Sequence, residues 1–309
     1  MKRIFQLLPF SMLVTALMLL TFSSCQKEDT EYYEDLKFSK ETYFVPLGHE
    51  LHVNIQRGNG DYEVVAADEA LFDWNFSNEN YYPGYFKFKG KKLGTTTLTV
   101  ADKKNAAKVN LTIHVVDPFQ FFQVLEIMPQ IKIKDNASSS KLEEIRQEIL
   151  KYRNFEKQQV ILLKANAKRD YYIFKDDKSI SVDQILENGL FQINLFTDYG
   201  PSGLTMKKEG SSNSQHFKFH FLGNEVSDYL KVIIPKSSQN QELKASNRNY
   251  LAESPLPPND YFHIYNNVTS EIAKKYPEVE SASVFHYLHI LFRIQESSTT
   301  IDQNLLIKQ

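Results

Sequence analysis

Cysteine is almost absent from this sequence, because Cys25 is the only one among 309 residues. A single cysteine excludes an intramolecular disulfide, a zinc site made of thiolates and a dithiol redox pair, since each of these needs more than one. An excess of charge of one sign is absent as well, because 36 basic residues stand against 38 acidic ones. The sequence therefore gives no indication of a nucleic-acid partner, which would require a strongly basic surface.

Catalytic signatures are also missing from the sequence. It contains no Gly-x-Ser-x-Gly elbow, Walker loop, dinucleotide-binding fingerprint or His-Glu-x-x-His helix. His216 and His220 would lie about 13 Å apart along one face of a strand, which is too far for them to chelate a metal ion together. We expect no catalytic residue, no metal site and no cofactor. A hydrolase with paired carboxylates remains an alternative, because its two acids can be distant in the sequence.

The first 24 residues have the pattern of a secretory signal. Lys2 and Arg3 supply a basic start, and residues 7–22 are almost entirely apolar. This apolar stretch contains Pro9 and is shorter than the ~20 residues that a membrane-spanning helix needs. We therefore predict a cleaved signal peptide over residues 1–24.

The signal ends in Phe22-Ser23-Ser24-Cys25, which resembles the lipobox of bacterial lipoproteins. The resemblance implies cleavage before Cys25, a diacylglycerol on its thiol and a further acyl chain such as palmitate on its amine. Several acyl chains hold a protein firmly to a bilayer, at roughly 0.8 kcal/mol per buried CH₂. Cys25 is thus the predicted lipidation site, and a membrane is the predicted partner. The alternative is an ordinary signal peptide with an incidental cysteine nearby.

Residues 25–35 form an acidic, polar stretch that is predicted to be a flexible tether. Directly behind the cysteine come Gln26, Lys27, Glu28 and Asp29, and this run resembles the export signal of Bacteroidota-type surface lipoproteins. The resemblance implies an outer-membrane lipoprotein exposed on the cell surface. The alternative is that these four residues are only a spacer.

Residues 36–117 alternate between apolar and polar positions in short runs separated by polar turns, which is typical of an all-β domain. The segments 57–64, 89–100 and 109–113, above all Gly90-Lys91-Lys92-Leu93-Gly94-Thr95-Thr96, resemble the bacterial Ig-like domain of group 2 type. The resemblance implies a β-sandwich that serves as a spacer or a binding module and has no catalytic residues.

Residues 118–309 change in texture after Asp117-Pro118, and the sequence there predicts an α+β domain of unrecognised family. A capping box beginning at Ser140 and apolar residues at helical spacing predict a helix over 141–153. Shorter helices are predicted over 181–189 and 269–276. Candidate strands lie near 120–133, 159–166, 170–175, 190–196, 215–222, 229–234 and 283–295.

A cluster of tyrosines beside a Pro-Gly turn is the candidate ligand site. Tyr81, Tyr82 and Tyr85 can offer flat rings and hydroxyls to an extracellular glycan or protein. The alternative is that they pack over the edge of the sandwich. Trp74 shares a strand face with two phenylalanines and is predicted to lie in the core.

Together these patterns predict a surface-directed outer-membrane lipoprotein that binds or scaffolds something outside the cell and is not an enzyme. A fimbrial or assembly subunit that polymerises by donating a strand is the first alternative. A hydrolase acting on a glycan or a peptide is the second.

Overall fold

A computed structural model of the chain describes most of the region that follows the acidic stretch. Its described residues are 33–79, 81–134, 138–194, 203–220, 232–233, 261–291, 294–295 and 297–307. The predicted signal peptide, Cys25 and the four residues that follow it lie outside the described residues. No helix in the described part of the chain is long and apolar enough to cross a membrane.

The first half of the described chain is a β-sandwich of two four-stranded sheets, with strand orders β1-β3-β6-β5 and β2-β8-β7-β4. The strands are β1 (Lys37–Phe38), β2 (Thr42–Pro46), β3 (Glu50–Arg57), β4 (Tyr62–Ala66), β5 (Phe72–Ser77), β6 (Tyr85–Gly90), β7 (Gly94–Asp102) and β8 (Lys108–Val116). Alternation along each strand sends one set of side chains inward. Val53, Ile55, Phe86, Phe88 and Leu111 are fully buried between the sheets.

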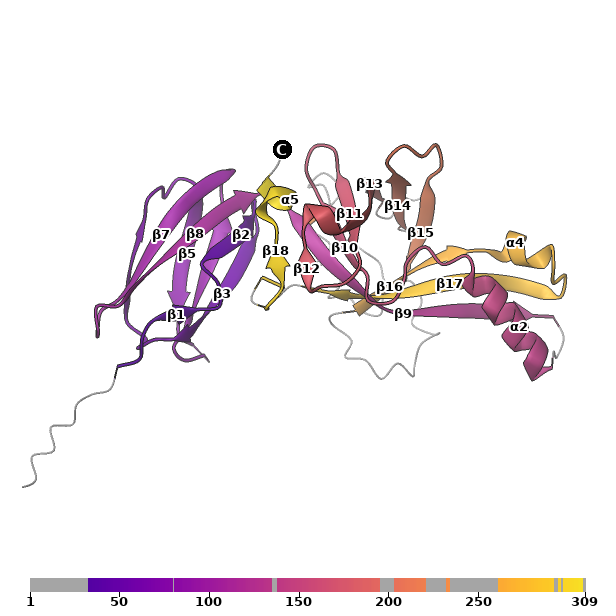
Figure 1. Ribbon diagram of the computed structural model, residues 1–309, viewed down its shortest axis with the longest axis horizontal. Coiled ribbons are helices and arrows are strands. Elements are labelled where there is room, and N and C mark those ends of the chain that lie inside the picture. Colours follow the sequence, from indigo (N-terminus) through magenta and orange to yellow (C-terminus); the bar gives the residue numbers. More distant parts are fainter. Residues whose placement is uncertain are drawn as a thin grey trace, which may run out of the picture.

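The second half is built around a closed barrel in which each strand is antiparallel to its neighbours and β17 closes onto β9. Its strands are β9 (Phe119–Ile133), β10 (Val160–Lys164), β11 (Asp170–Phe174), β13 (Ile185–Asn194), β14 (Gly203–Lys208), β15 (Gln215–His220), β16 (Tyr261–Asn267) and β17 (Val279–Ile290). Side chains fill the interior, among them Phe122, Phe155, Met206 and Phe262. The barrel lies beside the sandwich along the long axis of the molecule (Figure 1).

This barrel differs from the α+β domain that the sequence predicts for residues 118–309. The predicted helix over 181–189 is one 3-10 turn, η1 (Val182–Gln184), and the chain then enters β13. Residues 185–189 pair with β11, where Glu187 lies opposite Ile173 and Gly189 opposite Tyr171, so strand pairing replaces the end of the predicted helix. β14 and β16 are absent from the predicted strands. The predicted strand at 229–234 lies outside the described residues apart from 232–233, which form a turn.

The predicted helix over 141–153 is present as α2 (Ser139–Leu150), capped by the Ser138 side chain rather than by Ser140. β9 and β17 continue past the barrel as a two-stranded arm, and α2 packs on this arm through Ile145 and Ile149. The short helix α4 (Thr269–Ala273) packs against the same arm (Figure 1).

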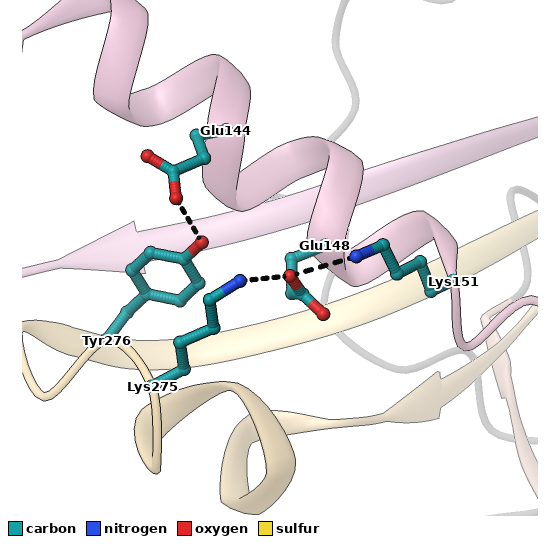
Figure 2. A network of polar contacts seen from close by, with 5 residues as sticks. All are labelled: Glu144, Glu148, Lys151, Lys275 and Tyr276. Carbon is teal, nitrogen blue, oxygen red and sulfur yellow. Dashed lines mark hydrogen bonds and ion pairs between the residues drawn. The ribbon is translucent and has the colours of Figure 1, made fainter.

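Polar contacts tie α2 to the segment that follows α4 (Figure 2). The Lys275 ammonium donates to Glu148 at 2.6 Å, and the Tyr276 hydroxyl donates to Glu144 at 2.7 Å. Lys151 reaches Glu148 from the same helix at 3.2 Å. The hydrogen bond from Lys275 and that from Lys151 hold the pKa of Glu148 below its ordinary value. Because Glu148 is shared by two lysines, it stays ionised and fixes the end of the arm.

Sandwich and barrel meet at a common apolar cluster. Phe44 and Val116 from the sandwich join side chains from the outer face of the barrel and from the C-terminal segment. That segment includes β18 (Thr300–Ile301), which pairs in parallel with β12 (Ser179–Ile180), and the helix α5 (Gln303–Ile307). The remaining members of the cluster are Phe119, Phe121, Val160, Leu162, Phe174, Ile180, Ile294, Leu305 and Leu306.

Two polar contacts reinforce this junction. The Phe44 N–H donates to Gln295 Oε1 at 2.7 Å, and Gln295 Nε2 donates to the Phe44 carbonyl at 2.8 Å. Both groups belong to β2, an edge strand, so the buried amide makes the pair of bonds that a neighbouring strand would make. Lys40 Nζ also donates to the Thr299 carbonyl at 2.6 Å. The sandwich is thus hydrogen-bonded as well as packed against the rest of the chain.

Candidate functional site

Tyr81 and Tyr82 form an exposed pair in the connection between β5 and β6. Their exposed fractions are 42% and 73%. The Tyr82 ring lies over Gly60, because its Cε2 is 3.5 Å from the position that a Cβ would take there. The Tyr82 side chain therefore stands at the surface beside the turn between β3 and β4, and the exposed Tyr81 precedes it in the same loop.

Tyr85 does not belong to this pair. It begins β6 on the outer face of its sheet, since the next residue, Phe86, is fully buried between the sheets. Its ring lies 5.5 Å from that of His52, and the Lys87 ammonium lies 5.6 Å from its centre. The three predicted ligand tyrosines are thus divided between a loop and a sheet face.

A partly buried aromatic layer supports the loop from below. The Tyr62 hydroxyl accepts a hydrogen bond from the Gly60 N–H at 3.0 Å, and its ring meets Phe76 edge-on at 5.2 Å. Burial raises the pKa of Tyr62 to about 12, so its hydroxyl stays neutral. Gly84 adopts a φ of +120°, and a Cβ there would collide with the Phe76 ring. The loop is therefore held in place by the packing of Gly84 against the Phe76 ring, which Tyr62 contacts in turn.

The chain enters the sandwich next to this loop. Asn59 Oδ1 accepts from the Glu34 N–H at 3.0 Å, and Asn59 Nδ2 donates to the Glu34 carbonyl at 2.9 Å. The same Asn59 amide donates to the fully buried Asp102 carboxylate at 2.8 Å, and Asn105 Nδ2 donates to the Glu34 carbonyl at 2.8 Å. Glu34 is therefore bonded to Asn59, and the next residue, Gly60, is the one over which the Tyr82 ring lies.

Trp74 was predicted to lie in the core, and the structure corrects this in part. Its ring meets the buried Phe86 edge-on at 6.1 Å, but 37% of the residue is exposed. The physical reason is that β5 is the last strand of its sheet, so no further strand covers its outer edge.

A second candidate site is a cleft of about 460 Å³ at the junction of sandwich and barrel. Lys40, Thr42 and Phe44 form one wall, and residues of the C-terminal segment such as Thr299 and Gln303 form the other. The lining combines hydroxyl, amide and charged groups with the apolar side chains of Phe44 and Ile301, and burial lowers the pKa of Lys40. Sequence reasoning missed this cleft because its two walls are more than two hundred residues apart.

Histidines and acids outside these two sites make structural contacts. His286 is buried among the aromatic side chains Phe155 and Phe217 inside the barrel. Asp176 accepts from the Lys178 N–H within a turn. Within the described ranges, no three His, Cys, Asp or Glu side chains come close enough together to hold a metal ion.

Comparison with known proteins identifies no family. No family model matches the sequence, and no curated protein matches it. Solved structures that share local similarity are surface-layer and cadherin proteins. Domains 4 and 5 of the S-layer protein SbsC are 19% identical over 27% of this chain and 52% of that one, with a TM-score of 0.23. Domains 5–6 of SbsC are 14% identical over 61% of this chain and 90% of that one, with a TM-score of 0.23.

The extracellular cadherin domains 1–4 of protocadherin gamma B7 are 10% identical over 82% of this chain and 76% of that one. Their TM-score is 0.21. The chain spans about half the length of the first S-layer fragment that it matches. Scores this low do not establish a common arrangement of the strands.

Proposed function

We propose that the protein is an outer-membrane lipoprotein, anchored through Cys25 and exported by Gln26, Lys27, Glu28 and Asp29, which holds its barrel away from the cell surface. Residues 36–117 would serve as an Ig-like spacer of group 2 type and residues 118–309 as the presented domain. The role is one of binding or scaffolding, without catalysis.

One observation carries this proposal: the anchor side and the barrel join opposite ends of the sandwich. Glu34 is fixed beside Asp102 at the end of β7, whereas the barrel follows Val116 at the far end of β8. β8 spans nine residues, so the sandwich separates the two ends by about 27 Å. The bonds of Phe44 with Gln295 join the barrel to the sandwich at this far end.

A second candidate function is ligand binding at the junction cleft. The cleft has the volume of a small-ligand site and a lining rich in hydroxyl and amide groups, which suits a glycan or an extended peptide. Tyr81, Tyr82 and Tyr85 lie away from this cleft, and they are a separate set of proposed contacts for an extracellular glycan or protein.

Replacing Cys25 by Ala is expected to abolish membrane anchorage. Without the thiol there is no acceptor for the diacylglycerol. The protein would then either keep its uncleaved signal peptide or be released without a lipid anchor. Detergent-phase partitioning of cell extracts measures the effect, with Ser24→Ala as the matched control that keeps the cysteine. Equal partitioning of Cys25→Ala and the unaltered protein would contradict the proposal.

Replacing Lys27, Glu28 and Asp29 by Ala is expected to preserve anchorage but to remove surface exposure. The altered tether keeps its length and its cysteine, so only the export signal changes. Protease added to intact cells should then degrade less of the protein, while detergent partitioning stays as before. Replacement of Glu31 alone by Ala provides a control that changes the net charge of the tether by the same amount. If protease removes both variants equally, the acidic run is only a spacer.

A further inference from the structure

We propose that Tyr81 and Tyr82 contact the headgroup layer of the same bilayer that holds the lipid anchor. The inference rests on the proposed lipidation of Cys25 and names a partner for the exposed tyrosine pair. It places that pair on the membrane-facing end of the sandwich, instead of on a surface directed at other cells.

The length of the tether brings this end close to the bilayer. From Cys25 to Tyr33, the first described residue, the chain has eight Cα–Cα steps and reaches at most about 29 Å. Glu34 is then bonded to Asn59, beside the Gly60 on which the Tyr82 ring lies. The tether therefore keeps the end of the sandwich that bears the tyrosine pair within about 29 Å of the bilayer.

The chemistry of this end suits an interface between water and lipid. Tyrosine has an apolar ring and a polar hydroxyl, which is why it gathers at the headgroup level of membranes. Tyr82 is 73% exposed, and Tyr33, at 37%, lies at the entry of the chain nearby. The surrounding charges have mixed sign, since Lys103 pairs with Asp61 at 3.0 Å. A headgroup layer without net charge therefore fits better than a strongly anionic one.

The tether makes a weak contact effective. Two tyrosines give only a modest affinity for lipid, and a free protein at micromolar concentration would show little binding. A short tether raises the effective concentration of the contact to about the millimolar range, so a contact with a Kd of about 1 mM becomes substantially occupied. The sandwich would then stand on its anchored end in a preferred orientation.

The chain offers two unique chemical handles for the test, because Cys25 is the only cysteine and Trp74 the only tryptophan. The mature chain from Cys25 is coupled through its thiol to a maleimide-headgroup lipid in phosphatidylcholine vesicles that contain brominated acyl chains. Tyr82→Trp in a Trp74→Phe background places the only indole on the loop. The matched control is Leu186→Trp in the same background, at a residue of the barrel with 55% exposure.

We expect the brominated lipid to lower the fluorescence of the Tyr82→Trp protein about twofold and to leave that of the Leu186→Trp protein nearly unchanged. A flexible insert of twenty residues after Asp29 should weaken the quenching, because a longer tether lowers the effective concentration. Denaturant melts of both variants confirm that they are folded. Absence of quenching in the Tyr82→Trp protein, or equal quenching in both proteins, overturns the inference and returns the tyrosines to a glycan or protein ligand.

This test is independent of the processing in the cell, because the lipid is attached chemically. The Cys25→Ala experiment tests the natural anchor. Quenching with a failed Cys25→Ala result would therefore reject the proposed lipidation alone, and the reverse combination would reject only the tyrosine contact.

Discussion

Leu305→Ala combined with Leu306→Ala is expected to lower the free energy of unfolding by roughly 4 kcal/mol or more. Both side chains are almost fully buried in the cluster that joins the C-terminal segment to the outer face of the barrel and to the sandwich. Their truncation removes apolar contacts and leaves a cavity that rigid β-strands cannot close. Denaturant titration measures the loss.

Ile307 provides the matched control for this double substitution. It is the next residue of α5, but 38% of it is exposed. Ile307→Ala should therefore lower the free energy of unfolding by less than about 1 kcal/mol. A similar loss in both proteins would mean that α5 matters as a helix and not through the two buried leucines.

Lowering the pH from 7 to 4 is expected to destabilise the protein through His286. Burial lowers the pKa of this imidazole to about 4, against an opposing backbone hydrogen bond with Ile264. Below pH 6.5 the unfolded state therefore takes up a proton that the folded state does not, and the loss is complete near pH 4. The difference corresponds to roughly 3 kcal/mol of unfolding free energy.

His286→Phe should remove this part of the pH dependence. The ring would still fill the space between Phe155 and Phe217, although the Asn154 N–H loses the acceptor that His286 Nε2 provides at 3.4 Å. That loss is independent of pH and shifts the whole curve instead of its slope. His52→Phe, at an exposed position, is the control. If the slope between pH 6.5 and 4 is the same in all three proteins, His286 does not titrate as described.

Local periodicity made parts of the fold predictable from the sequence. Strand alternation and glycine turns indicated the short strands of residues 36–117, and helical spacing of Ile145 and Ile149 indicated α2. In each case, the signal lies within a dozen residues.

The barrel was not predictable in the same way, because its closure depends on contacts that are distant in sequence. β9 pairs with β17, whose residues follow more than one hundred positions later. β14 has only Leu204 and Met206 pointing inward, too few alternating positions to stand out. The junction was not predictable for the same reason, because Phe44 and Gln295 are separated by 251 positions in the sequence.

The amide of Gln295 has a consequence for how copies of this protein behave when they come close together. An open strand edge is a template on which a strand of another molecule can add, and this leads to aggregation or to polymerisation. On β2 the N–H and carbonyl of Phe44 are already occupied by that amide. A donated strand would have to displace Gln295 and loosen the barrel from the sandwich. The contact that joins these two parts therefore also opposes the addition of strands along this edge.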